Sequence, residues 1–363
     1  MSDTEWITAA LERALDSVAA RTELEGYPHV TENGRWVLSD DGFWTGGFWI
    51  GLLWAGYEER RDERFRAAAE RLLETFAGRA TEARNHDLGM MFTPSAVKGF
   101  ELTGEPRYRD AALVAADTLA SQFNDRGSFL PGWGFFGEEG WEGASLIDTL
   151  MNLRLLFWAT EETGEDRFRT VALAHARTSL AHHLRQDGST YHLYRFDPET
   201  GEPLHGDTYQ GKSPDSCWSR GLGWLIAGCG EIAADGGGDA FVEAAERGVE
   251  YYLANLPADA IPYWDFSADT SEPRDASAGA IAAYGLVLLG KEREATRCLH
   301  ALAERAQAPA GHPAILLHAT ADLPHGIGID ESTIYGDYYF VRALQELRDR
   351  LTVASDAGVL QAD

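Results

Sequence analysis

Lysine is nearly absent from this sequence of 363 residues, in which only Lys98, Lys212 and Lys291 occur among 31 basic side chains. Aspartate and glutamate together number 58, so the formal net charge is −27. No basic face is available to meet phosphates, which argues against a nucleic-acid partner. The acids alternate with apolar stripes, as on the surface of a folded protein. An acidic, lysine-poor shell resembles that of proteins from salt-saturated cytoplasm, where salt screens self-repulsion, and it predicts a halophilic protein.

Cysteine is also scarce, and Cys217, Cys229 and Cys298 are widely spaced and odd in number. They form neither a metal-ligand motif nor a disulfide framework, so we expect a reducing interior. The first residues lack the basic and apolar segments of a secretory signal peptide, and no apolar run reaches transmembrane length. We therefore expect a soluble, cytoplasmic protein with no membrane partner. Its oligomeric state, monomer or homodimer, is left open.

Apolar residues recur at three- and four-residue intervals along most of the chain, which is the period of an amphipathic helix. This pattern predicts about twelve helices, at residues 4–20, 44–59, 62–78, 90–103, 106–123, 143–162, 165–184, 217–234, 239–254, 275–289, 292–307 and 331–350. A short turn follows each even-numbered helix, and a long segment follows each odd-numbered one. An Arg-aromatic-Arg triplet, beginning at Arg64, Arg107 and Arg167, opens three of the odd-numbered helices and indicates a weak internal repeat.

The two kinds of helix differ in composition. Even-numbered helices are more apolar and richer in Gly and Trp, whereas odd-numbered ones carry charge along one side, as buried and surface helices do. Six such hairpins predict an all-α (α/α)6 barrel, a six-hairpin toroid, as one domain over residues 1–351 with a loosely ordered tail at 352–363. The alternative is an open superhelix of helix pairs. An open array needs polar end caps, and the apolar last helix therefore favours closure.

In a closed ring, all the long connections project from the end at which the inner helices begin. Most of the 11 tryptophans lie in or beside these connections, together with carboxylates and histidines. Aromatic faces interleaved with polar groups are typical of a sugar-binding cleft. The same tryptophans would also be found there if they only plugged the mouth of the barrel.

Residues 143–158 are strongly apolar, yet they contain Asp148 and Asn152 one helical turn apart. Burying a carboxylate costs several kcal/mol unless it is paired, protonated or used. Taken alone, Asp148 is explained by a structural role near a helix start; at the mouth of a barrel it becomes a candidate catalytic acid.

Glycoside chemistry usually needs two carboxylates, one with a raised pKa. Asp87 is the second candidate, because Asn85 and His86 precede it at the expected start of an inner helix. If the two acids meet in a partly dry pocket, one of them should stay protonated near neutral pH. Rival acids, more typical of loops or helix caps, are Asp265, Asp269, Asp275, Asp330 and Asp337.

Motifs for other chemistries are incomplete. His182-His183, expected on the surface of an outer helix, and His192 with His205 lack zinc spacing. The three glycines at 236–238 follow no strand, so they form a turn and not a phosphate loop. Ser219 lacks the glycine two positions earlier that a nucleophile elbow requires.

Five motifs in order give the chain a resemblance to glycoside hydrolase family 88, the unsaturated glucuronyl hydrolases. They are Asn-His-Asp-Leu-Gly (85–89), Ser-Leu-Ile-Asp-Thr-Leu-Met-Asn (145–152), Thr-Tyr-Gln-Gly (208–211), Trp-Ser-Arg-Gly-Leu-Gly-Trp (218–224) and Tyr-Gly-Asp-Tyr-Tyr-Phe (335–340). The resemblance runs from Trp44 to about Leu347. The (α/α)6 barrel of that family agrees with the fold expected from the helix pattern.

The resemblance implies removal of a Δ4,5-unsaturated uronic acid from the non-reducing end of an oligosaccharide made by a polysaccharide lyase. Asp148 would protonate C4 of the double bond and activate water for attack at C5, while Asp87 would bind ring hydroxyls and hold Asp148 at its working pKa. Arg220 is the candidate partner of the substrate carboxylate. Further substrate-binding candidates are Trp44, His86, Trp133, His192, Gly206, Thr208, Gln210, Trp218, Trp224 and His325. No metal or organic cofactor is implied.

Two departures from the family pattern concern the pocket. The arginine motif usually continues Gly-Gln-Ala-Trp, and here it reads Gly-Leu-Gly-Trp (221–224); Met90-Met91 stand where an aromatic residue is usual. These two departures bear on which sugar adjoins the uronic acid more than on the reaction itself. One alternative is an unsaturated rhamnogalacturonyl or galacturonyl hydrolase on the same barrel. The other is a non-catalytic carbohydrate-binding barrel, which would bind sugar without turnover.

Overall fold

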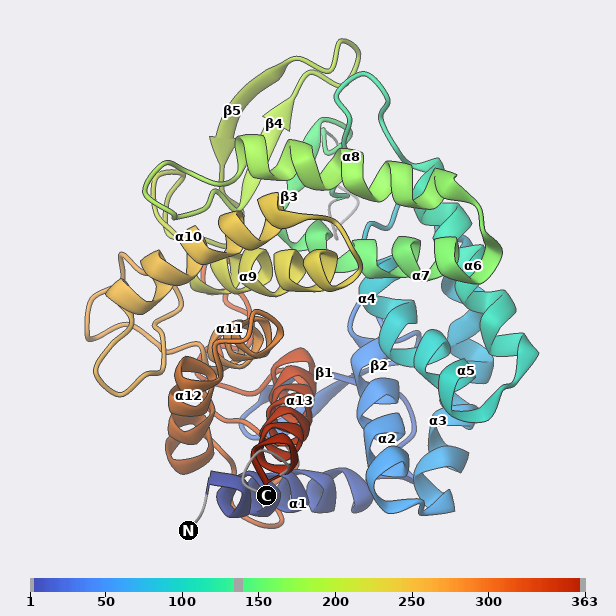
Figure 1. Ribbon diagram of the computed structural model, residues 1–363, viewed down its shortest axis with the longest axis vertical. Coiled ribbons are helices and arrows are strands. Elements are labelled where there is room, and N and C mark those ends of the chain that lie inside the picture. Colours follow the sequence, from blue (N-terminus) through green and yellow to red (C-terminus); the bar gives the residue numbers. More distant parts are fainter. Residues whose placement is uncertain (1–2, 134–139, 360–363) are drawn as a thin grey trace.

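The computed structural model describes residues 3–133 and 140–359 of the chain, and within them the helices form two concentric rings (Figure 1). The inner ring consists of α2 (Gly46–Arg60), α4 (Leu88–Phe92) with its continuation α5 (Lys98–Thr103), α7 (Leu153–Thr163), α9 (Ser219–Ala234), α11 (Ala276–Leu288) and α13 (Ile334–Val359). The outer ring consists of α1 (Asp3–Ala19), α3 (Glu63–Phe76), α6 (Pro106–Ser121), α8 (Asp166–His182), α10 (Asp239–Asn255) and α12 (Glu292–Arg305).

The inner ring is closed. Each inner helix packs against the next, from α2 through α4, α7, α9 and α11 to α13, and α13 packs against α2. Helix α1 contacts α2, α12 and α13, so the first helix of the chain fills the outer position beside the last inner helix. The predicted (α/α)6 barrel is therefore confirmed, and the open superhelix is excluded because its two ends would not meet.

Small and apolar side chains explain why the inner helices are buried. In α11 every residue from Ala276 to Val287 is buried. Gly285 allows α11 to approach α9 closely, because a Cβ atom there would lie 2.7 Å from the backbone nitrogen of Ala227. Outer helices bury one face only, as α3 does with Phe65 and other residues at helical spacing.

The long connections contain strands that helical periodicity did not predict. Strands β1 (Tyr27–Glu32) and β2 (Arg35–Ser39) form an antiparallel hairpin, while β3 (Ala144–Leu146), β4 (Leu193–Phe196) and β5 (Pro203–Asp207) form a three-stranded sheet in that order. The helix expected from residue 143 is therefore wrong at its start. Ala144 pairs with Arg195 across the sheet, a 3-10 helix η3 (Ile147–Asn152) follows, and α7 begins only at Leu153.

His183 also lies elsewhere than expected. Its side chain is fully buried, and its ring nitrogens lie 3.2 Å from the Tyr191 carbonyl oxygen and 3.1 Å from Ser145 Oγ. The expectation that it lies on an outer surface is wrong because the β3–β4 sheet covers this end of α8. Only the neighbouring His182 is partly exposed.

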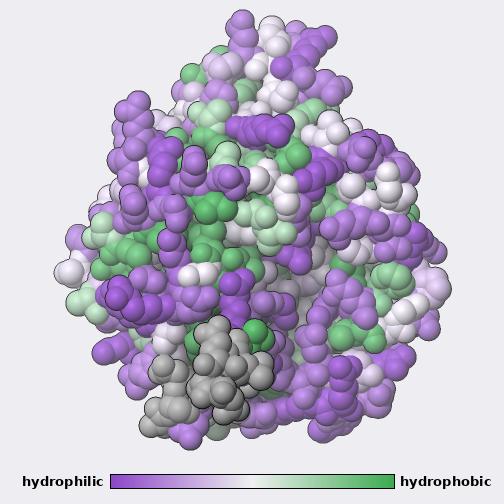
Figure 2. All heavy atoms as spheres, viewed as in Figure 1, coloured by the Kyte–Doolittle hydropathy of each residue, from purple (hydrophilic) through white to green (hydrophobic). Residues whose placement is uncertain are grey.

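The expected division of the chain at residue 351 falls within α13, which continues to Val359. Residues 360–363 lie outside the described part of the chain, and a loosely ordered tail stays a prediction. None of the described helices combines the length and apolarity needed to cross a bilayer. Hydrophilic side chains dominate the face seen in Figure 2, in keeping with the acidic composition.

Candidate active site

A cavity of about 590 Å³, partly open to solvent, lies at the end of the barrel where the inner helices begin. It is lined by His29, Phe43, Trp44, Asp87, Met90, Asp148, Gln210, Trp218, Arg220, Trp224, Ala321, Asp322, Ile327 and Tyr335. The lining residues come from segments far apart in the sequence. The cavity therefore depends on closure of the ring, which brings Trp44 of the first connection onto Tyr335 of α13 with ring centroids 5.2 Å apart.

Asp87 and Asp148 meet because η3 lies directly against α4. Gly89 permits this contact, since a Cβ atom there would be 2.2 Å from the carbonyl oxygen of Asn152. Asn152 then joins the two elements: its Oδ1 accepts a hydrogen bond from the Met90 backbone N–H at 2.7 Å, and its Nδ2 donates to Asp87 Oδ1 at 3.4 Å. The polar residue one turn after Asp148 therefore positions the other carboxyl group.

Burial governs the charge of both acids, whose exposed fractions are 1% for Asp87 and 8% for Asp148. Desolvation raises the pKa of each to about 7; His86 and Arg220 partly offset the effect on Asp148, and Asn152 partly offsets it on Asp87. Asp87 Oδ2 and Asp148 Oδ1 are buried and accept no hydrogen bond from the described residues. Buried acceptors of this kind are typical of a site that a ligand completes.

Two buried histidines adjoin the site, His86 beside the carboxyl groups and His192 beside Trp218. His86 Nε2 is 3.5 Å from Asp87 Oδ1 and 3.8 Å from Asp148 Oδ1. His192 packs against Trp218 with ring centroids 4.5 Å apart, and its Nδ1 accepts hydrogen bonds from the backbone N–H groups of Tyr209 and Gln210, both at 3.1 Å. Burial lowers the pKa of both histidines, so both rings are neutral near pH 7.

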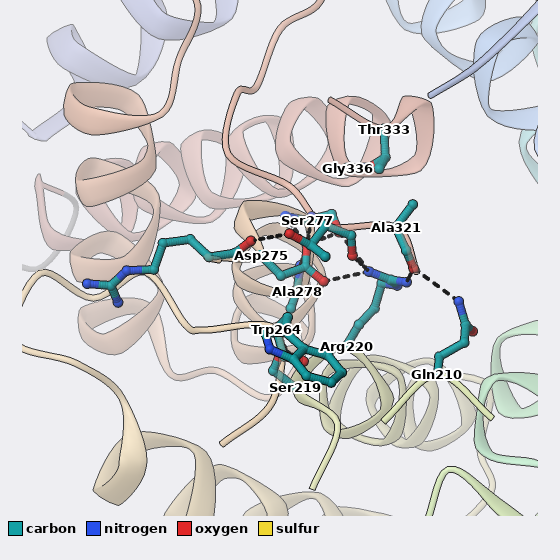
Figure 3. A network of polar contacts seen from close by, with 12 residues as sticks. Gln210, Ser219, Arg220, Trp264, Asp275, Ser277, Ala278, Ala321, Thr333 and Gly336 are labelled. Atoms are coloured by element: carbon teal, nitrogen blue, oxygen red, sulfur yellow. Dashed lines mark hydrogen bonds and ion pairs between the residues drawn. The ribbon is translucent and has the colours of Figure 1, made fainter. Parts of the chain in front are cut away.

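The guanidinium of Arg220 is held by hydrogen bonds within the fold (Figure 3). It is 2% exposed, and one terminal nitrogen donates to Asp275 Oδ2 at 2.5 Å and to the Thr320 carbonyl oxygen at 2.7 Å. The other donates to the Ala321 carbonyl oxygen, which also accepts from Gln210 Nε2 at 3.0 Å. Asp275 already balances the charge of Arg220, which disfavours a second ion pair, and contact of Arg220 with a substrate carboxylate stays a prediction.

The predicted site residues fall into three groups. Trp44, Asp87, Asp148, Gln210, Trp218, Arg220 and Trp224 all line the cavity. His86 and His192 are not part of the lining but contact residues that are: Asp87 and Asp148 for His86, and Trp218 for His192. Trp133, Gly206, Thr208 and His325 are outside the lining set. They belong to the segments that surround the cavity.

These four surrounding residues make contacts of their own. Trp133 donates from Nε1 to Gln122 Oε1 at 2.6 Å. Thr208 Oγ1 accepts from the Gly211 N–H at 2.8 Å, and Gly206 leaves room for the ring of Tyr191. His325 stacks on Tyr209 with centroids 4.3 Å apart, and its Nδ1 is 2.8 Å from Asp322 Oδ1. A direct contact of these residues with substrate stays a prediction.

Several cavity residues were missed by the sequence analysis. His29 and Phe43 come from the first long connection, and Ala321, Asp322 and Ile327 come from the last. The sequence does contain a local indication for Asp322. It stands three residues before His325, a spacing at which the carboxylate can accept a hydrogen bond from the imidazole. His29 and Phe43 carry no such local signal, since the β1–β2 hairpin places them.

The rival acids are engaged elsewhere in the fold. Asp275 is paired with Arg220, Asp330 lies 2.7 Å from His318, and Asp265 accepts a hydrogen bond from Ser216 Oγ at 2.7 Å. Asp337 accepts from the backbone N–H groups of Ile315 and Leu316, and Asp269 accepts from Ser271. Among the described residues, no group of three or more acids, histidines or cysteines is arranged to hold a metal ion.

Comparison with known proteins identifies the family. Residues 10–287 match the family described as Glycosyl Hydrolase Family 88. The chain belongs to glycosyl hydrolase family 88. It is therefore a glycoside hydrolase, and family membership speaks against a barrel that only binds sugar.

Relatives of this family 88 enzyme match it over nearly its whole length. It is 36% identical to an unsaturated chondroitin disaccharide hydrolase of Streptococcus pyogenes serotype M1, over 93% of this chain and 90% of that protein. It is 34% identical to an unsaturated glucuronyl hydrolase of Bacillus sp. (strain GL1), over 90% of this chain and 92% of that protein. A solved structure of an unsaturated glucuronyl hydrolase specific for heparin superposes with a TM-score of 0.91 at 29% identity, covering 96% of this chain and 98% of that one.

Proposed function

We propose that this family 88 hydrolase removes a Δ4,5-unsaturated glucuronic acid from the non-reducing end of an oligosaccharide produced by a polysaccharide lyase. The observation that carries the proposal is a pair of buried carboxyl groups, Asp87 and Asp148, on the wall of a cavity that also contains three tryptophans. The names of the relatives support the substrate class, and a solved relative at 33% identity is described with the oligosaccharide dGlcA-Glc-Rha-Glc.

The reaction is hydration of a vinyl ether. Asp148 gives its proton to C4, and the cation that develops at C5 is stabilised by the ring oxygen. Water then adds to C5 while the Asp148 carboxylate accepts one of its protons, so the acid is regenerated. The resulting hemiketal opens by breaking the bond between C5 and the ring oxygen, which leaves a hemiacetal at C1. Collapse of that hemiacetal to an aldehyde releases the next sugar with its proton.

The remaining cavity residues orient the sugar. Asp87 acts as the carboxylate of the pair in this reaction and accepts hydrogen bonds from ring hydroxyls through Oδ2, which accepts none from the described residues. Trp44, Trp218 and Trp224 supply apolar faces for stacking. Arg220 lies over the ring of Trp218 at 4.5 Å and holds the backbone at Ala321, so it shapes the wall and contributes its electric field without a direct ion pair.

A panel of unsaturated disaccharides tests the proposal. Loss of the ultraviolet absorbance of the conjugated double bond is followed for glucuronyl and galacturonyl substrates, with and without sulfate on the adjoining sugar. Turnover of glucuronyl substrates is expected. Preference for galacturonyl substrates would instead indicate the rhamnogalacturonyl type of enzyme, and absence of turnover across the panel would refute the proposal. Cytoplasmic location and a monomeric or homodimeric state stay predictions.

A further inference from the structure

His86 is held as a single tautomer by the backbone. Its Nδ1 accepts a hydrogen bond from the Trp133 N–H at 3.2 Å, so the lone pair of that nitrogen points at a donor. A proton on Nδ1 would face this N–H group, and the contact would be lost. The neutral ring must therefore carry its proton on Nε2.

The protonated nitrogen faces both carboxyl groups of the site. Nε2 lies 3.5 Å from Asp87 Oδ1 and 3.8 Å from Asp148 Oδ1, and the imidazole is 1% exposed. These distances are slightly longer than a hydrogen bond, as is common for catalytic contacts before substrate is bound. A small movement shortens either distance, so the one N–H group can donate a hydrogen bond to either carboxylate.

Burial keeps His86 neutral among the charged and titratable groups that surround it. Burial lowers its pKa, and Asp148 acts in the opposite direction. Further groups with electrostatic effects on this cluster are Arg220 on Asp148, Arg79 on Asp87, and the buried rings of His175 and His192. Burial lowers the pKa of both rings, so neither adds a positive charge near pH 7.

We propose that His86 is a positioning residue for the reaction: its Nε2–H group, fixed by the Trp133 backbone, stabilises the Asp87 carboxylate and the negative charge that develops on Asp148. The inference rests on the proposed function, because that reaction ionises Asp148. Before proton transfer Asp87 bears the charge and Asp148 the proton. After transfer two adjacent carboxylates are ionised, and the donor between them offsets part of their repulsion.

An interaction that strengthens only after proton transfer raises kcat and leaves KM nearly unchanged. This differs from the substrate-binding role expected from the sequence, which would appear in KM. It also differs from a purely structural role, which would lower stability and would leave the ionisation of the acids as it is.

Two substitutions separate the functions of the two ring nitrogens. In His86→Asn the side-chain oxygen can still accept from the Trp133 N–H, but no donor reaches the carboxyl groups. In His86→Gln the amide N–H₂ can occupy the position of Nε2. We expect kcat of His86→Asn to fall about 100-fold, as when one fixed donor to a developing oxyanion is removed, with rescue in His86→Gln. Thermal unfolding followed by circular dichroism verifies that both variants fold.

The pH profile of kcat is the second readout. Without the donor both carboxylates are less stable as anions, so both limbs of the profile should move to higher pH in His86→Asn and return in His86→Gln. A change in KM alone, or an unshifted profile in His86→Asn, would overturn the inference.

A third measurement does not depend on turnover. The ¹⁵N NMR shifts of histidine-labelled protein should show His86 as the neutral Nε2–H tautomer at pH 7, with its signals assigned by their absence in His86→Gln. The Nδ1–H tautomer would refute the inference even if every substrate were turned over. Failure of the substrate panel with the expected tautomer would refute only the proposed function.

Discussion

At the scale of single residues, the site depends on acids that retain protons at neutral pH. Asp148 has an ordinary pKa when the chain is unfolded and a pKa of about 7 in the cavity, because burial disfavours its charged form. The folded protein therefore binds more protons than the unfolded one between about pH 4 and 7, and stability falls as pH rises through this window. The proposed catalytic acid therefore lowers the stability of the folded protein near neutral pH.

Asp148→Asn should separate these two effects. We expect kcat on an unsaturated disaccharide to fall by about 10³-fold or more, since the proton donor is removed. At pH 8 the variant should melt at a higher temperature than the parent, and the difference should shrink toward pH 5, where the parent carboxyl is protonated. Calorimetry at several pH values measures the second effect. Retention of activity would disprove the catalytic role.

The Arg220–Asp275 pair gives a second prediction. Asp275→Asn leaves a buried guanidinium without its counter-ion, which should cost about 3–5 kcal/mol of unfolding free energy in urea titrations. The exposed pair of Lys291 and Glu246, 3.0 Å apart, is the matched control. Glu246→Gln should cost less than about 1 kcal/mol. Equal costs for the two variants would mean that the buried pair is dispensable.

At the scale of elements, the contact between α4 and η3 sets the spacing of the two acids. Gly89→Ala would place a methyl group against the backbone of Asn152, and backbone cannot rotate away as a side chain can. We expect a loss of about 1–3 kcal/mol in stability and a lower kcat, because the two elements must separate. Gly78→Ala is the control, since a Cβ atom there meets nothing within 4 Å. Equal losses of stability and of kcat in Gly89→Ala and Gly78→Ala would contradict the assigned role of Gly89.

Helices were predictable because their signal is local. The apolar period of α9 or α11 spans a few turns of chain and needs no knowledge of partners. Strand β3 was not predictable, because its three residues read like the helix that follows and pair with β4 about 50 residues later. The pairing of Arg220 with Asp275 was missed for the same reason: the partners are separated by 55 residues. The motifs placed Asp87 and Asp148 in the cavity but gave no information on the tautomer of His86.

At the scale of the whole molecule, the net charge of −27 dominates. We propose that the fold requires salt, because acidic side chains on the surface repel one another and mobile ions screen that repulsion. The melting temperature should rise steeply between dilute buffer and molar KCl. An uncharged osmolyte at equal osmolarity is the control and should give a smaller rise. A melting temperature that does not change with KCl would refute the halophilic interpretation.

Closure of the ring by the last helix has a consequence for the nascent chain. Strand β1 lies against the segment before α13, where the Thr31 N–H donates to the Ser332 carbonyl oxygen at 2.9 Å, and Trp44 stacks on Tyr335. The wall of the cavity is therefore incomplete until α13 has left the ribosome. Five hairpins can form one after another as they emerge, but the cavity is complete only when α13 packs against α2.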